Sequence, residues 1–200
     1  MSAHSLDVSL MEAFFVSSGV VLIAEIGDKT QLLALMLAAR YRAPVAVILG
    51  IFCATVLNHL AAAWVGSLIA DWLTPQTLRW VLVVSFLAMA AWTLVPDKEE
   101  DAPALVSNAG AFVATTIAFF LVEIGDKTQI ATVALAARFN DIVLVTAGTT
   151  AGMMLADVPA VFAGSFFSKK MPLKLIRICA ASVFTILAIA VLIDLAVGIL

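Results

Sequence analysis

The chain alternates between long apolar runs and short polar breaks. About 20 apolar residues are enough for a helix to cross the hydrocarbon core of a membrane, and six runs reach that length. The predicted transmembrane helices cover residues 10–39, 43–70, 77–95, 107–137, 142–167 and 173–199. The first and fourth are longer than one crossing needs, so we expect them to be tilted, kinked or broken. The acidic break at 96–106 divides the chain into segments 1–95 and 107–200.

Composition places the chain among integral membrane proteins. Its 200 residues are 64% hydrophobic and only 12% charged, and the mean hydropathy is +1.12. A soluble domain of this size could not hide so much apolar surface. We therefore expect an all-α membrane protein whose partner is the lipid bilayer. No basic cluster suits nucleic acid, and the sequence leaves a homo-oligomer open. The N-terminus lacks the features of a cleaved signal peptide, so the first span should be retained.

An internal repeat is the most informative feature of the sequence. The heptapeptide Glu25-Ile-Gly-Asp-Lys-Thr-Gln31 returns unchanged as Glu123–Gln129, 98 residues later. The same offset relates Ala38-Ala39-Arg40 to Ala136-Ala137-Arg138, Gly50 to Gly148, Gly66-Ser67 to Gly164-Ser165, and Arg79 to Arg177. A constant offset across three helices indicates duplication of a three-helix unit. Because three is odd, the second unit enters the membrane from the opposite side. The prediction is two inverted repeats, typical of secondary transporters with a site at the repeat interface.

The loop charges predict the orientation. Cytoplasmic loops carry an excess of lysine and arginine. Under the six-span model, seven basic residues lie on one side: Arg40, Arg42, Lys98, Lys169, Lys170, Lys174 and Arg177. Only Arg79 and Arg138 lie on the other. We therefore expect the loops after the first, third and fifth spans, including the acidic linker 96–106, to be cytoplasmic. Both termini should be external.

The duplicated motif places ionisable groups where they are costly. A charged residue at a membrane helix centre costs about 2.5–3.5 kcal/mol, so an intramembrane acid is by default a functional candidate. On a continuous helix, Glu25 and Asp28 share one face, and so do Glu123 and Asp126. The glycine between the two acids permits close backbone approach and weakens the helix locally. If the two helices meet, these four carboxylates converge, and we predict them as the ligands of a metal ion.

Four carboxylates in a cavity of low dielectric cannot all remain ionised unaided, because like charges repel and burial disfavours charge. Either cations or protons must neutralise them, which is the chemistry of an exchanger. An oxygen-only ligand set suits hard ions such as Mn²⁺, Ca²⁺ or Mg²⁺. The expected cargo is a divalent cation and protons, with no prosthetic group and no enzymatic activity. Metal reaches the acids from the cytoplasm, the repeats rock, and protons displace the metal.

Further polar residues near the motifs are secondary candidates for metal binding or proton movement. They are Lys29, Thr30, Gln31, Lys127, Thr128, Gln129, Asn58, His59 and Asp157. His59 and Asp157 occupy equivalent positions of the two repeats. The lysines either serve as internal counter-ions when metal is absent or extend away from the acids along the helix.

Other interpretations of the motif remain open at this stage. The acids and lysines could form a static ion-pair network, although such networks are often no better than apolar packing. A cation channel could use the same acids without proton coupling. Asp28 and Asp126 could form the dyad of an intramembrane aspartyl protease, although Glu-x-Gly-Asp replaces the Gly-x-Gly-Asp of such enzymes. An exporter of organic cations or amino acids is a fourth possibility.

The double signature Glu-x-Gly-Asp-[Lys/Arg]-[Ser/Thr], at Glu25–Thr30 and Glu123–Thr128, resembles the GDT family. That family includes Golgi Mn²⁺/Ca²⁺ transporters and bacterial manganese exporters. The resemblance covers essentially the whole chain and implies cation/proton antiport, with the motif acids as the metal site and Mn²⁺ as the favoured substrate. The chain lacks the N-terminal targeting extension and long central loop of eukaryotic members. It therefore resembles a compact prokaryotic version in the inner membrane.

Overall fold

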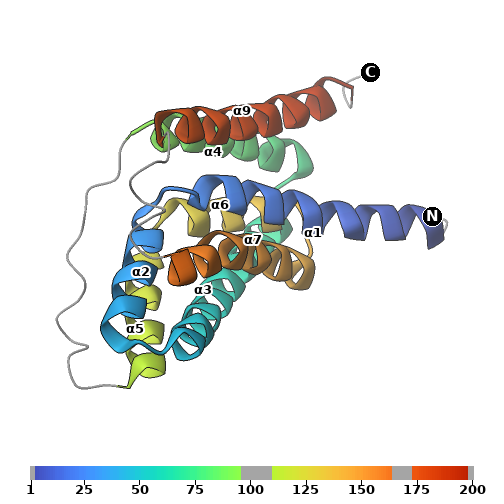
Figure 1. Ribbon diagram of the computed structural model, residues 1–200. Coiled ribbons are helices and arrows are strands. Elements are labelled where there is room, and N and C mark those ends of the chain that lie inside the picture. The colour runs from blue at the N-terminus through green and yellow to red at the C-terminus, as the bar shows by residue number, and fades with distance from the viewer. Residues whose placement is uncertain (1–2, 96–109, 164–172, 198–200) are drawn as a thin grey trace.

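The computed structural model describes residues 3–95, 110–163 and 173–197, and within them all regular structure is helical (Figure 1). The helices are α1 (Ala3–Glu25), α2 (Lys29–Tyr41), α3 (Pro44–Trp72), α4 (Pro75–Thr93), α5 (Ala111–Glu123), α6 (Lys127–Phe139), α7 (Ile142–Ala163) and α9 (Leu173–Val197). Four of them, α3, α4, α7 and α9, contain stretches long and apolar enough to cross a membrane. The predicted linker 96–106 lies outside the described residues.

The first and fourth predicted spans are each broken into two helices, which confirms that their length is not used as one straight helix. The breaks separate α1 from α2 and α5 from α6. At their centres Gly27 and Gly125 have φ angles of 81° and 76°. Glycine adopts this left-handed conformation without the steric cost that a side chain adds, so its presence allows the chain to leave the helix.

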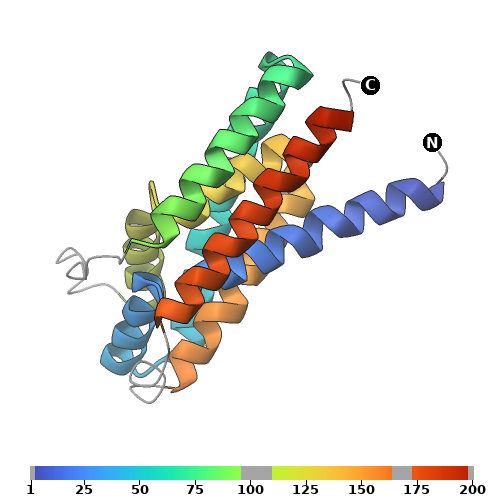
Figure 2. The same ribbon diagram turned by 90° about the horizontal axis from the view of Figure 1, so that it is seen from above.

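Each half of the chain packs mainly against the other half. The broken helix α1–α2 packs against α7, and α5–α6 packs against α3. The last helices, α4 and α9, lie side by side along one flank of the bundle (Figures 1 and 2). The start of α1 and the end of α9 lie at the same end of the bundle (Figures 1 and 2). The two halves are therefore held together by packing between helices of one half and helices of the other.

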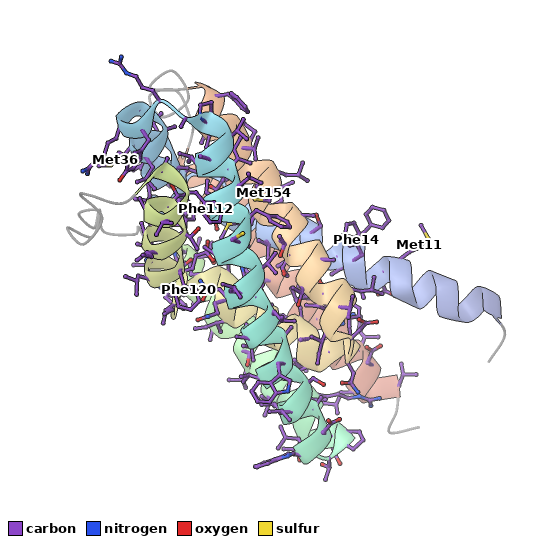
Figure 3. All side chains as sticks on the ribbon, turned by 90° about the horizontal axis from the view of Figure 1, so that it is seen from below. Met11, Phe14, Met36, Phe112, Phe120 and Met154 are labelled. Carbon is purple, nitrogen blue, oxygen red and sulfur yellow. The ribbon has the colours of Figure 1, made fainter. Side chains whose placement is uncertain are left out.

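Equivalent glycines make equivalent close contacts in the two halves. A Cβ atom added to Gly50 of α3 would lie 2.7 Å from Thr115 Cβ and 2.8 Å from Phe112 O of α5. A Cβ atom added to Gly148 of α7 would lie 3.1 Å from Ser17 Cβ and 2.4 Å from Phe14 O of α1. Phe14 is the counterpart of Phe112 at the offset of 98 residues. Figure 3 shows Phe112 on α5 beside α3. The offset of 98 residues thus relates contacts as well as sequence.

Two apolar clusters enclose the breaks. One is centred on α4 and α9 and includes the fully buried rings of Phe86 and Phe184. The other lies between α2, α3 and α5 and includes Ile51 and Phe119. Many other large apolar side chains are exposed on the outer helix faces, as in a protein whose surroundings are lipid. The polar motifs therefore lie in an otherwise apolar interior.

Candidate cation site

Each break follows one pattern of hydrogen bonds. Asp28 N donates to Glu25 O at 3.0 Å, and Gly27 N donates to Gln31 Oε1 at 2.8 Å. Asp28 then caps α2, because its Oδ1 accepts from Lys29 N at 2.8 Å. These bonds satisfy backbone groups that the interrupted helix leaves without partners. The motif sequence therefore specifies the break locally.

The second break repeats the two hydrogen bonds of the turn, although the side chain of Asp126 does not cap α6. Asp126 N donates to Glu123 O at 3.0 Å, and Gly125 N donates to Gln129 Oε1 at 2.7 Å. The two glutamines thus hold the breaks through their side-chain oxygens. Gln31 also donates from Nε2 to Ala156 O of α7 at 3.0 Å, which ties the first break to the other half.

The prediction that the acids of each motif share one helix face is wrong. Glu25 is the last residue of α1, whereas Asp28 precedes the first residue of α2, and a turn separates them. Glu123 and Asp126 are separated in the same way. The rule for residues three apart holds only within a continuous helix. It fails because the glycine breaks the helix between the acids.

Three of the four predicted ligands nevertheless converge. Glu25, Asp28 and Asp126 each offer a carboxylate oxygen, and these oxygens all lie within 4.8 Å of one another. The three residues are 0%, 5% and 4% exposed. Ca²⁺ holds oxygen ligands at about 2.3–2.6 Å, so two oxygens on one ion lie up to about 5 Å apart. The cluster therefore has the dimensions of a site for a hard divalent cation, drawn from both halves.

The helix ends add to the electrostatics of this cluster. Asp28 and Asp126 stand at the N-termini of α2 and α6, where the helix dipole favours negative charge. Glu25 stands at the C-terminus of α1, where the dipole favours a cation instead. Broken helices that direct their ends at a bound ion are a recurring arrangement in transporters.

Glu123, the fourth predicted ligand, is held by α3. Its Oε1 accepts from Thr55 Oγ1 at 3.1 Å, and its Oε2 accepts from Asn58 Nδ2 at 3.2 Å. Asn58 Nδ2 also donates to Phe120 O at 3.1 Å, and Figure 3 shows Phe120 on α5 facing the side of α3. The two equivalent glutamates therefore have different surroundings, because residues 153 and 156, the counterparts of Thr55 and Asn58, are methionine and alanine.

The two motif lysines lie close to the acids of the site. Lys29 Nζ is 3.5 Å from Asp126 Oδ1, so the lysine of one half pairs with an acid of the other. The side chain of Lys29 is 20% exposed, and that of Asp126 is 3% exposed. Lys127 is buried, with its Nζ 6.0 Å from the centre of the Trp92 ring. This distance is within the range of a cation–π interaction.

Most of the remaining predicted residues are buried around the breaks, whereas Gln129 is half-buried. Thr30 and Thr128 are fully buried, and so are His59 and Asp157. Within the part of the chain that the structure describes, no hydrogen bond reaches the side-chain polar atoms of these four residues. Asp157 nevertheless lies next to the first break, because the carbonyl oxygen of the adjacent Ala156 accepts from Gln31 Nε2 at 3.0 Å.

A pocket leads to the cluster from one side. It lies between α1, α4, α6 and α9, contains about 260 Å³ of empty space including its open mouth, and has Asp28 in its lining. Lys127 and Arg177 line it, together with Thr93. It gives small ions and water a way to one of the three clustered carboxylates.

Sequence reasoning missed three residues near the site. Thr55 has a signal in the sequence, since it precedes Asn58 by three residues and His59 by four, which places all three on one face of α3. Trp92 and Arg177 have none, because only the packing of α4 and α9 against the breaks brings them there.

Comparisons with known proteins identify the family of the chain. The family model described as "Divalent cation/proton antiporter GDT1" matches twice, over residues 13–101 and again over 111–198. The chain is 53% identical over 182 residues to a protein of Vibrio cholerae named "Putative manganese exporter", covering 90% of each chain. It is 28% identical over 204 residues to a GDT1-like protein of Synechocystis, covering 90% of this chain and 96% of that protein. No solved structure matches.

The family model accounts for almost the whole chain, and both matched ranges contain one copy of the acidic motif. Membership of a transporter family favours antiport over the channel and the intramembrane protease. The resemblance suggested by the double motif is thus confirmed, and the chain belongs to the GDT1 family of divalent cation/proton antiporters.

Proposed function

We propose that this protein exports Mn²⁺, and accepts Ca²⁺ less readily, in exchange for protons at a carboxylate site shared by two inverted repeats. The observation that carries the proposal is the convergence of Glu25 and Asp28 from one half with Asp126 from the other. The name of the Vibrio cholerae relative supports Mn²⁺ as the substrate.

The contacts between the halves support the inverted arrangement. Along α1 and α7 the residue numbers rise together, since Gly148 contacts Ser17 and Gly152 contacts the backbone of Ser18 and Leu22. These helices therefore run parallel, and α3 runs parallel to α5 by the equivalent contacts of Gly50 with Phe112 and Thr115. Since α3 follows α2 through a tight turn, the first helices of the two halves point in opposite directions. The two family matches also begin 98 residues apart, at 13 and 111.

The exchange follows from the charges at the site. A divalent cation binds Glu25, Asp28 and Asp126 and neutralises their repulsion. When the repeats rock and the ion leaves, protons take over that neutralisation. Lys29 contributes a tethered positive charge at Asp126, so metal and ammonium compete for one carboxylate. Glu123, held by Thr55 and Asn58, completes the ligand set when the halves move relative to each other.

The location follows from the same model. The protein resides in the inner membrane of a prokaryote with both termini external. The pocket that Asp28 lines then opens towards the cytoplasm, because Arg177 belongs to the basic residues predicted on that side. Metal enters through this pocket.

The proposal is tested by Mn²⁺ uptake into proteoliposomes under an imposed pH gradient. Asp28→Asn and Asp126→Asn each remove one ligand charge with little change of volume, and we expect either to abolish proton-driven uptake. Asp71→Asn, at an exposed acid outside the site, is the matched control and should transport normally. Normal transport by both site variants would refute the shared site. Flux that follows voltage and ignores the pH gradient would indicate a channel. Competition by Ca²⁺ in the same assay ranks the two ions.

A further inference from the structure

Five hydroxyl side chains gather where α1 meets the first half of α7. They are Ser17 and Ser18 on α1 and Thr146, Thr149 and Thr150 on α7. The close approach at Gly148 and Gly152 brings the two serines to the level of these threonines. All five residues are at least nine-tenths buried, with exposed fractions from 0% to 9%.

Three of these hydroxyls lack the hydrogen bond to a carbonyl oxygen of the same helix that a buried threonine commonly makes. Thr149 Oγ1 donates to Val145 O of its own helix at 2.8 Å. For Ser17, Thr146 and Thr150, no hydrogen-bond partner of the hydroxyl occurs among the described residues. A buried hydroxyl without a partner costs about 1–3 kcal/mol. Three of them within two turns would therefore be expensive if the region were dry.

The threonines lead towards the cation site. Thr146, Thr150 and Asp157 are spaced by four and seven residues, so they share one face of α7. This face begins one turn after the start of α7 at Ile142 and extends about 16 Å to Asp157. Asp157 is fully buried, and the carbonyl oxygen of its neighbour Ala156 accepts a hydrogen bond from Gln31 Nε2 of the first break at 3.0 Å. The hydroxyls thus connect one end of the bundle with the carboxylates.

The equivalent face in the other half is apolar. At the offset of 98 residues, Thr146, Thr149 and Thr150 correspond to Ile48, Ile51 and Phe52 of α3. Ile51 is fully buried in an apolar cluster. Ser17 and Ser18 have the hydroxyl-bearing counterparts Thr115 and Thr116, and Thr115 is also buried. The three threonines of α7 are therefore the part of the group that belongs to one half only. Packing does not require them, because α3 makes the same kind of contact without them.

We propose that the face of α7 formed by Thr146, Thr150 and Asp157, together with Ser17, binds a file of water molecules that gives protons access to the cation site. Water that bridges buried polar groups satisfies them at little cost, and a buried water needs two to four polar partners. The proposal rests on the proposed antiport. It assigns proton access to the end of the bundle where α7 begins, opposite to the pocket at Asp28.

Hydroxyl-radical footprinting tests the water file without relying on transport. Met153 is fully buried and lies on the same face, between Thr150 and Asp157. Met89 is equally buried, at 2% exposure, but belongs to an apolar cluster. Radicals generated from water by X-rays oxidise the thioether sulfur of a methionine that water reaches. In the detergent-solubilised full-length protein, we expect Met153 to be oxidised several-fold faster than Met89. Equal, slow oxidation of both would overturn the proposal.

Valine variants test what the water does. Thr150→Val and the pair Thr146→Val with Thr150→Val remove hydroxyls at constant shape. Thr149→Val is the matched control, because its hydroxyl is bound to its own helix. We expect the first two to slow Met153 oxidation and proton-driven Mn²⁺ uptake several-fold while equilibrium Mn²⁺ binding is unchanged. Uptake that equals that of the control would contradict the proposal. Absence of proton-driven uptake in the unaltered protein would refute the antiport itself. The oxidation rates of Met153 and Met89 would still test the water file in that case.

Discussion

At the scale of single residues, the site combines acids from both halves with a basic side chain that crosses between them. Lys29 lies 3.5 Å from Asp126 Oδ1, and Asp126 is one of the three clustered carboxylates. A cation bound by these oxygens must displace or share the contact with the ammonium group. We therefore expect the lysine in the motif to influence the affinity of the proposed site for metal.

Replacing Lys29 by glutamine should strengthen Mn²⁺ binding. An ion pair of this exposure is worth at most about 1 kcal/mol, which corresponds to about a fivefold lower dissociation constant when the competitor is removed. Isothermal titration of the purified protein at low ionic strength measures this change. Lys174→Gln, at an exposed position of α9, is the control and should bind as the unaltered protein does. Unchanged or weaker binding by Lys29→Gln would show that the lysine does not compete with the metal.

Sequence reasoning anticipated the acids better than their partners. The cost of charge in an apolar run was enough to single out Glu25, Asp28 and Asp126, which the fold brings together. The hydrogen bonds from Thr55 and Asn58 to Glu123 depend on how α3 packs against α5. Asn58 was a candidate and Thr55 shares its helix face, but a spacing within one helix carries no information about that register, so their bonds to Glu123 were not predictable.

At the scale of helices, the apolar runs located the helical segments of the described chain, and run length indicated that the first and fourth would be tilted, kinked or broken. What failed was the geometry at the break, because the helical face rule was applied across Gly27. The glycines of α3 and α7 have a different role from those of the breaks. They let two helices approach until backbone touches backbone, which is how membrane helices gain packing energy.

Gly148→Ala should destabilise the bundle by about 1–3 kcal/mol, since an added methyl group would lie 2.4 Å from Phe14 O and α1 cannot move aside cheaply. Gly50→Ala should cost a similar amount, because its methyl group would lie 2.8 Å from Phe112 O. Thermal unfolding in detergent measures both. Gly19→Ala provides the control, as nothing lies within 4 Å of the added atom, and alanine favours a helix. Equal stability of all three variants would mean that these contacts do not hold the halves together.

At the scale of the whole molecule, the two halves are chemically unequal copies of one unit. The motifs, breaks and glycine contacts are shared, whereas the neighbours of the two glutamates and the threonines of α7 differ. Duplication explains the first set. In the proposed exchange, the second set gives the two sides of the membrane different tasks, because metal is received on one side and protons on the other.

The dependence of each half on the other leads to a prediction for a divided chain. Since α1–α2 packs against α7 and α5–α6 against α3, neither half buries its own motif. We expect residues 1–100 and 101–200, produced as separate chains in Mn²⁺-sensitive cells, to restore growth only when both are present, and to co-purify. A second half carrying Asp126→Asn should still co-purify with the first but should not restore growth, because assembly needs the helix faces whereas export needs the shared carboxylates. Growth restored by either half alone would show that one repeat forms a complete site, and would refute a site built from Glu25, Asp28 and Asp126 together.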